Sequence, residues 1–236
     1  MSRLLLPLAL LPLAAVAALA QGGVAVRGRL TIAERAGEPT RDVAEAVVWL
    51  VPVGAPGSQP RRAEAGRGAP AAEILMQGRQ FTPRVRVVGL GGAVEFPNGD
   101  PFRHNAFSNS ALGPFDLGLY GKGERKGVTP ARAGVYTVYC DIHARMRAHL
   151  VVVPSALWTQ PGLDGRWTIA AVPPGRYVLR AWHERGGETA REVVVTAGAT
   201  PGVDDAAIAL DARGYAVQPH KNKFGRDYPT RTGDRY

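Results

Sequence analysis

The 236-residue sequence contains only one cysteine, Cys140, and therefore cannot form an internal disulfide bond. Beyond residue 20 it has no apolar run long enough to cross a bilayer. It also lacks a sustained apolar stripe with the 3.6-residue period of an amphipathic helix, so no long helix is predicted. Its hydrophobic content of 45% is normal for a globular protein.

Acidic residues are scarce, since 20 Asp and Glu stand against 29 Lys and Arg, a formal charge of +9. Such an excess favours an acidic partner or a membrane surface. No basic helix with base-reading side chains is present, so nucleic acid is not expected as a partner. Part of the charge lies in a basic C-terminal tail, residues 212–236.

Residues 1–20 are typical of a secretory signal peptide. Arg3 precedes an apolar stretch, and Ala18-Leu19-Ala20 fits the small-x-small cleavage rule. The stretch is short for a membrane span and contains Pro7 and Pro12, so we expect cleavage and no stable membrane anchor. The mature protein is expected in a bacterial periplasm. A lone thiol in that oxidising compartment must be buried, paired between chains or bound to metal.

The segment Cys-Asp-Ile-His-Ala-Arg-Met, residues 140–146, places a thiol, an imidazole and a thioether at three-residue intervals. Both flanks, 135–139 and 149–153, are rich in β-branched and aromatic residues and predict strands. A short loop between two strands therefore carries three candidate metal ligands. His104 lies upstream and is a fourth candidate. One Cys thiolate, two imidazoles and a weak axial Met form the ligand set of a blue copper site.

Cys-x-x-His-x-x-Met after a strand, with an upstream His-Asn, resembles the cupredoxins, the amicyanin- and plastocyanin-like type 1 copper proteins. The resemblance covers residues 74–153 and implies a Greek-key β-sandwich or barrel. It implies one type 1 copper ion held by His104, Cys140, His143 and Met146. It also implies that the backbone N–H of Asn105 contacts the thiolate and ties the two ligand loops together.

The function implied by this resemblance is single-electron transfer between periplasmic redox partners, such as a cytochrome c or a dehydrogenase. Two other functions stay open: copper sequestration or delivery without electron shuttling, and a structural binding sandwich with a vestigial copper site. Individual residues also have alternatives, because Met146 could be a core methionine and His104 a solvated turn residue. His149 and His183 are interpreted as structural, and His220 as at most a weak surface contact.

A stand-alone enzyme is not expected. The sequence contains no Gly-x-Ser-x-Gly or His-Glu-x-x-His motif. It has no His-x-His pairs for a trinuclear copper cluster and no Cys-x-x-x-Cys for a binuclear one. The nearest pattern, His183-Glu184, lacks its second histidine.

A second β-sandwich is predicted from the C-terminal half. Asp-Gly-x-Trp-x-Ile from Asp164, followed by Pro-Pro-Gly-x-Tyr-x-Leu from Pro173, resembles the carboxypeptidase regulatory-like (transthyretin-like) sandwich. Two strands alone are marginally stable in water, so those predicted in residues 24–53 need partners. We favour pairing of 24–53 with 163–211, which makes the copper domain an excursion between two strands. The alternative assigns 24–53 to the copper domain. The predicted fold class is thus all-β, with two sandwiches.

Overall fold

The structure is a computed structural model that describes residues 23–54, 71–197, 206–217 and 219–228. Within these residues the fold is all-β, with one short 3-10 helix, η1 (Val43–Glu45). The predicted signal peptide, residues 1–20, lies outside the described residues. None of the helices in the described part of the chain is long and apolar enough to span a membrane.

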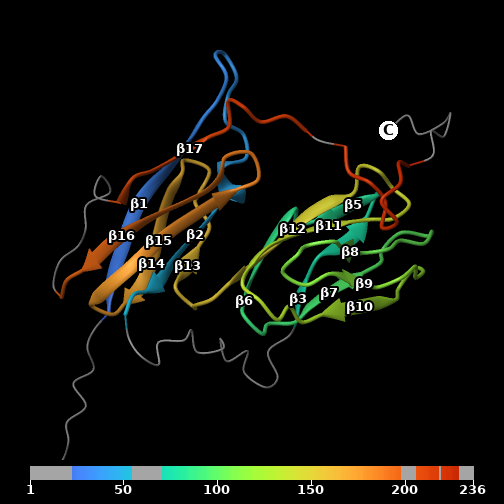
Figure 1. The fold of residues 1–236 in the computed structure, drawn as a ribbon, viewed down its shortest axis with the longest axis horizontal. Coiled ribbons are helices and arrows are strands. Elements are labelled where there is room, and N and C mark those ends of the chain that lie inside the picture. The colour runs from blue at the N-terminus through green and yellow to red at the C-terminus, as the bar shows by residue number, and fades with distance from the viewer. Residues whose placement is uncertain (1–22, 55–70, 198–205, 218, 229–236) are drawn as a thin grey trace, which may run out of the picture.

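Strands from both ends of the chain form one sandwich, which we call the terminal sandwich (Figure 1). One of its sheets has the order β14-β1-β17 and the other β13-β2-β15-β16. β1 pairs antiparallel with β14 and parallel with β17, and β2 pairs antiparallel with β15 and β13. The bounds are β1 Val24–Ala33, β2 Val47–Pro52, β13 Trp158–Thr159, β14 Arg166–Val172, β15 Gly175–His183, β16 Gly187–Val195 and β17 Ile208–Asp211. Strands of 24–53 therefore hydrogen-bond to strands that follow residue 157.

The strands between them form a second body beside the first, which we call the central sandwich (Figure 1). Its main sheet has the order β6-β12-β11-β8-β9, and it faces smaller sheets with the orders β10-β7-β3 and β4-β5. The bounds are β3 Ala72–Glu73, β4 Leu75–Gln77, β5 Gln80–Thr82, β6 Val85–Gly89, β7 Val94–Pro97, β8 Phe107–Ser108, β9 Phe115–Asp116, β10 Arg125–Val128, β11 Gly134–Tyr139 and β12 Arg147–Val153.

Alternation along the strands builds a separate core in each sandwich. In β1, Val26, Leu30 and Ile32 point inward, whereas Arg27, Arg29 and Thr31 are exposed. In β11, Tyr136 and Val138 enter the core of the central sandwich, and Cys140 continues the same inward series. The alternation of this strand therefore makes the thiol leave β11 on the core side.

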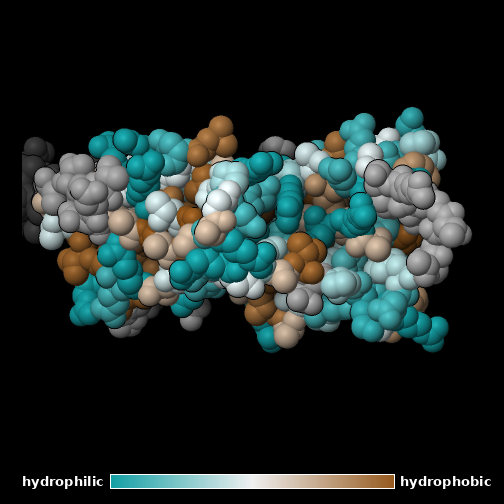
Figure 2. Space-filling model, turned by 90° about the horizontal axis from the view of Figure 1, so that it is seen from above, coloured by the Kyte–Doolittle hydropathy of each residue, from teal (hydrophilic) through white to brown (hydrophobic). Residues whose placement is uncertain are grey.

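A third apolar cluster joins the two sandwiches. It contains Val47, Trp49, Val85, Val87, Val151, Val153 and Trp182, drawn from both bodies. β12 contributes Leu150 and Val152 to its own core and Val151 and Val153 to this cluster, so both of its faces are buried. This explains why the strand is a continuous apolar run instead of an alternating one. Viewed from above, hydrophilic residues cover most of the molecule and hydrophobic ones appear in separate groups (Figure 2).

Candidate metal centre

The loop 140–146 joins β11 to β12 as a tight turn. The two strands pair in register up to Tyr139 and Arg147. Within the turn, the Cys140 N–H donates to the Met146 carbonyl at 3.3 Å, and the Met146 N–H donates to the His143 carbonyl at 3.1 Å. These bonds fold the chain back on itself, and they bring His143 over the sulfur of Cys140.

His104 comes from the segment between β7 and β8. Its backbone N–H and C=O both bond to Tyr120, at 3.1 and 3.0 Å. The Tyr120 hydroxyl in turn donates to the Phe96 carbonyl at 2.7 Å inside the core. Two layers of hydrogen bonds thus fix the backbone that carries this imidazole.

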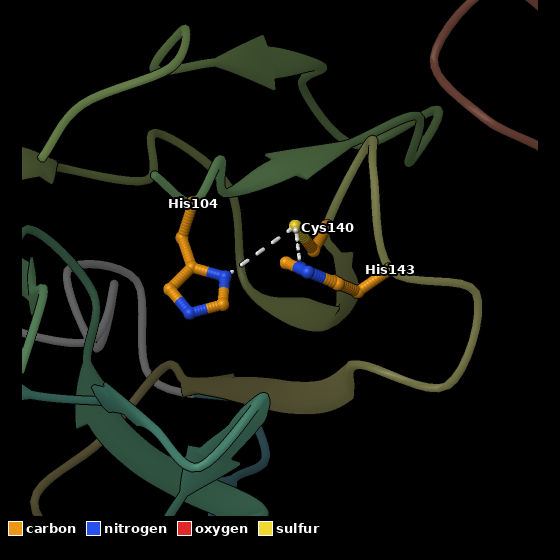
Figure 3. A group of neighbouring side chains, drawn as sticks. All are labelled: His104, Cys140 and His143. Carbon is orange, nitrogen blue, oxygen red and sulfur yellow. Dashed lines mark hydrogen bonds between the residues drawn. The ribbon is translucent and has the colours of Figure 1, made fainter. Parts of the chain in front are cut away.

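The two imidazoles and the thiol converge on one point (Figure 3). The Cys140 Sγ lies 3.5 Å from the His143 Nδ1 and 3.9 Å from the His104 Nδ1. The three candidate ligand atoms all lie within 4.8 Å of one another. One thiolate and two imidazole nitrogens around a common centre is the donor set of a trigonal copper site, and these residues fit such an ion.

Two of the three candidate ligands are buried, and the third reaches the surface. Cys140 and His104 are fully buried, whereas His143 is half-buried. Burial raises the pKa of the Cys140 thiol, and the backbone N–H groups of Ile142, Asn105 and His143 oppose this rise. A thiolate at this depth lacks water, so a bound cation is the partner that makes it favourable.

Asp100 orients the His104 ring. Its Oδ2 lies 2.7 Å from the His104 Nε2, and its two carboxylate oxygens accept from the backbone N–H groups of Gly78 and Arg79 at 2.9 and 3.0 Å. Burial raises the pKa of Asp100, but the bonds from Arg79, His104 and Gly78 outweigh burial, and the pKa lies below its usual value. An ionised Asp100 accepts a hydrogen bond from the Nε2–H of His104, which leaves the lone pair on Nδ1, the ring nitrogen nearer the sulfur.

Sequence reasoning missed Asp100. The signal that could have found the residue is its position four residues before His104.

Asn105 connects the two ligand-bearing loops through its side chain. Its Oδ1 accepts from the Asp141 N–H at 3.3 Å, and its Nδ2 donates to the Asp116 Oδ1 at 2.6 Å. Its backbone N–H is one of the groups that lower the pKa of Cys140. The residue is fully buried.

Met146 is 1% exposed and belongs to the same core cluster as Cys140. Its role as the axial ligand stays a prediction. The other histidines lie outside the three-residue cluster. His183 is buried with its Nε2 3.2 Å from the Asp42 carbonyl, and His149 is buried against Trp182. His220 stacks on Tyr139, with ring centroids 4.0 Å apart.

Partly exposed apolar side chains, which we call the apolar rim, lie beside the half-buried imidazole. The Phe102 ring lies 5.2 Å from the His104 ring and 5.8 Å from the His143 ring, centroid to centroid. Phe102 is 37% exposed and Ile142 46% exposed. The guanidinium of Arg79 sits 5.3 Å above the Phe102 ring. His143 therefore reaches the surface between apolar side chains with positive charge beside them.

No protein-family model matches the chain, and no curated protein matches it. Among solved structures it is similar to a copper-containing nitrite reductase from Thermus scotoductus SA-01, at 32% identity and a TM-score of 0.34. That match covers 36% of this chain and 22% of the reductase, so the chain spans about a fifth of that protein. It is also similar to amicyanin from Paracoccus versutus, at 22% identity and a TM-score of 0.34, over 36% of this chain and 83% of amicyanin.

Proposed function

We propose that this protein is an exported type 1 copper protein that carries single electrons between periplasmic redox partners. The observation that carries the proposal is the convergence of the Cys140 Sγ with the Nδ1 atoms of His104 and His143. When bound there, copper supplies a one-electron couple. The periplasmic location and the partner class, a cytochrome c or a dehydrogenase, belong to the proposal and rest on the sequence.

The burial of the ligands favours electron transfer over copper delivery. A delivery site must open readily to an acceptor, but Cys140 and His104 are fully buried and the loop is closed by its own hydrogen bonds. An electron needs no such opening. It can pass through the half-buried His143 ring to a partner that covers Phe102 and Ile142. The exposed apolar rim suits a transient contact, because such a contact excludes water from the ligand edge.

The test is the visible and EPR spectrum of the copper-reconstituted mature protein, together with its voltammogram. We expect an intense thiolate-to-copper band and a reversible one-electron couple, and we expect Cys140→Ser to abolish both. Copper bound without an intense band, and passed readily to a chelator, would contradict electron transfer and favour delivery.

The two histidines provide a matched pair of variants. In His143→Gly, the cavity opens toward solvent, so added imidazole should enter and restore the band. In His104→Gly, the cavity is fully buried, so added imidazole should restore little or none. Equal behaviour of the two variants would contradict the proposed exposed edge at His143.

A further inference from the structure

The C-terminal segment returns to the ligand loop of the central sandwich. After β17 the chain leaves the terminal sandwich and crosses to the other body, as the orange-red trace at the top of Figure 1 shows. We call residues 215–217 and 219–228 the strap. The strap begins at Tyr215, whose hydroxyl donates to the Glu184 Oε1 at 2.9 Å and accepts from Arg147 at 3.2 Å.

The strap holds residues on both sides of the thiol. The Tyr228 hydroxyl donates to the Cys140 carbonyl at 2.6 Å. The Lys223 N–H donates to the Asp141 Oδ1 at 3.0 Å. His220 stacks on Tyr139, with an interplanar angle of 26°, and lies 3.2 Å from the Tyr228 hydroxyl. Three consecutive residues of the central sandwich, 139–141, are thus contacted from outside by the strap.

The strap also joins the network that links the two ligand loops. The Lys223 Nζ donates to the Asp116 Oδ2 at 2.7 Å. The other oxygen of Asp116 accepts from Asn105, and Asn105 accepts from the Asp141 N–H. Lys223 therefore contacts both ends of one chain of hydrogen bonds, through its backbone at Asp141 and through its side chain at Asp116.

We propose that the strap is a positioning element that keeps the ligand loop closed and copper retained. Release of copper requires the part of the loop that carries His143 to move away from the Cys140 sulfur, and the strap's contacts with residues 139–141 restrain that movement. Outer groups that orient metal ligands commonly change metal affinity by about 10- to 100-fold when removed. The part of this inference that concerns copper rests on the proposed function; the part that concerns the loop does not.

The first experiment measures amide hydrogen exchange of the segment 140–146 in the copper-free full chain. We expect exchange to be about 10-fold faster in Tyr228→Phe and in Lys223→Ala, because the loop opens more often. The matched control is Lys221→Ala, which also removes one positive charge from the strap. Lys221 pairs with Asp227 at 3.4 Å, within the strap itself, and this pair does not hold the loop. This control should exchange like the parent. Unchanged exchange in Tyr228→Phe and Lys223→Ala would overturn the proposal.

The second experiment measures transfer of Cu(I) to a bathocuproine chelator. Tyr228→Phe, Lys223→Ala and a chain ending at Ala212 should release copper roughly 10-fold faster or more, with the thiolate band retained because no ligand is removed. Lys221→Ala and a chain ending at Tyr228 should behave like the parent. Faster loop exchange without faster copper release would overturn the retention role.

The two proposals fail in different ways. If neither the parent nor any variant shows the thiolate band, the proposed function fails. Hydrogen exchange in the copper-free chain then still decides whether the strap closes the loop. If the parent is blue but every strap variant matches it in exchange and in copper release, the strap fails and the proposed function stands.

Discussion

At the scale of single residues, burial and directed hydrogen bonds have opposite effects on the ionised groups of the site. Burial disfavours the thiolate of Cys140, while three backbone N–H groups favour it. His104 is oriented by an ionised Asp100 that is itself held by two backbone N–H groups. The donor atoms are thus arranged before any metal binds, and binding needs little rearrangement.

Met146→Leu tests the predicted axial ligand. Leucine conserves the volume of the buried side chain, so the free energy of unfolding should fall by less than about 1.5 kcal/mol. If the thioether binds copper, its loss removes a donor to Cu(II), and the reduction potential should rise. Voltammetry of the copper-loaded variant measures this shift. A potential equal to that of the parent would make Met146 a core residue only.

Asp100→Asn tests the carboxylate beside His104. The amide can still accept a hydrogen bond but carries no charge, so the imidazole becomes a weaker donor, chiefly toward Cu(II). The reduction potential should therefore rise by tens of mV, since a tenfold preferential loss of Cu(II) affinity corresponds to about 59 mV. The control is Asp164→Asn, an exposed carboxyl on the terminal sandwich, which should leave the potential unchanged. A fall in potential for Asp100→Asn would contradict the orientation role.

At the scale of elements, one arginine joins two segments of the terminal sandwich. Arg185, just after β15, donates to both oxygens of Glu34 at 2.6 and 2.7 Å and to both oxygens of Asp42 at 2.8 and 2.5 Å. Its bonds are the largest cause that holds the pKa of Glu34 below 4.5. Burial raises the pKa of Asp42, but the bonds of Arg185 and the charge of His183 outweigh it, and the pKa lies below 3.8.

The pH dependence of stability follows from these lowered pKa values. Both carboxyls stabilise the fold fully above their unfolded pKa values, 4.5 and 3.8, and lose that contribution as pH falls through the folded ones. Arg185→Gln should lower the free energy of unfolding by about 2 kcal/mol at pH 7 and by less below pH 4.

Urea unfolding at pH 7, 5 and 3.5 measures this difference. The control is Arg213→Gln, whose pair with Asp211 is exposed and should change stability little. If the loss of unfolding free energy in Arg185→Gln grew as the pH fell, this stabilisation would not come from the ionised carboxyls of Glu34 and Asp42.

At the scale of the whole molecule, the two sandwiches share the apolar cluster around Trp182, and a charged group lies beside it. Glu184 has a side chain that is 7% exposed, and it pairs with Arg147 at 2.6 Å and with Arg84. Arg147 comes directly after Met146, so the ligand loop is tied to the terminal sandwich through β12. We infer that the two bodies unfold together.

Trp182→Ala tests this coupling. Removal of the indole should cost about 3–5 kcal/mol, and the single thermal transition of the copper-free chain should split into two. Scanning calorimetry measures both effects. The control is Val194→Ala, because Val194 is 65% exposed on the same sandwich. A single transition with an unchanged midpoint in Trp182→Ala would show that the sandwiches are not coupled through this cluster.

Much of the local structure could be predicted from the sequence. The β-branched and aromatic flanks of residue 140 predicted strands, and the structure confirms them as β11 and β12. Given those strands, period-two alternation is enough to put Cys140 on the same side as Tyr136 and Val138. Three-residue spacing within a short loop keeps His143 and Met146 near the thiol whatever the rest of the chain does. Spacing alone could not show that Asp100 orients His104, because that contact depends on the backbone N–H groups of Gly78 and Arg79.

The sequence by itself determined the residue types of the donor set, the strands that flank the loop and the all-β class, since these depend on neighbours within a few residues. Only the tertiary structure decided that the imidazole of His104 lies 3.9 Å from a sulfur 36 residues away. It likewise decided that β12 is buried on both faces, and that the strap, a part of the basic tail, contacts residues 139–141. These contacts depend on the packing of distant segments, which no local spacing encodes.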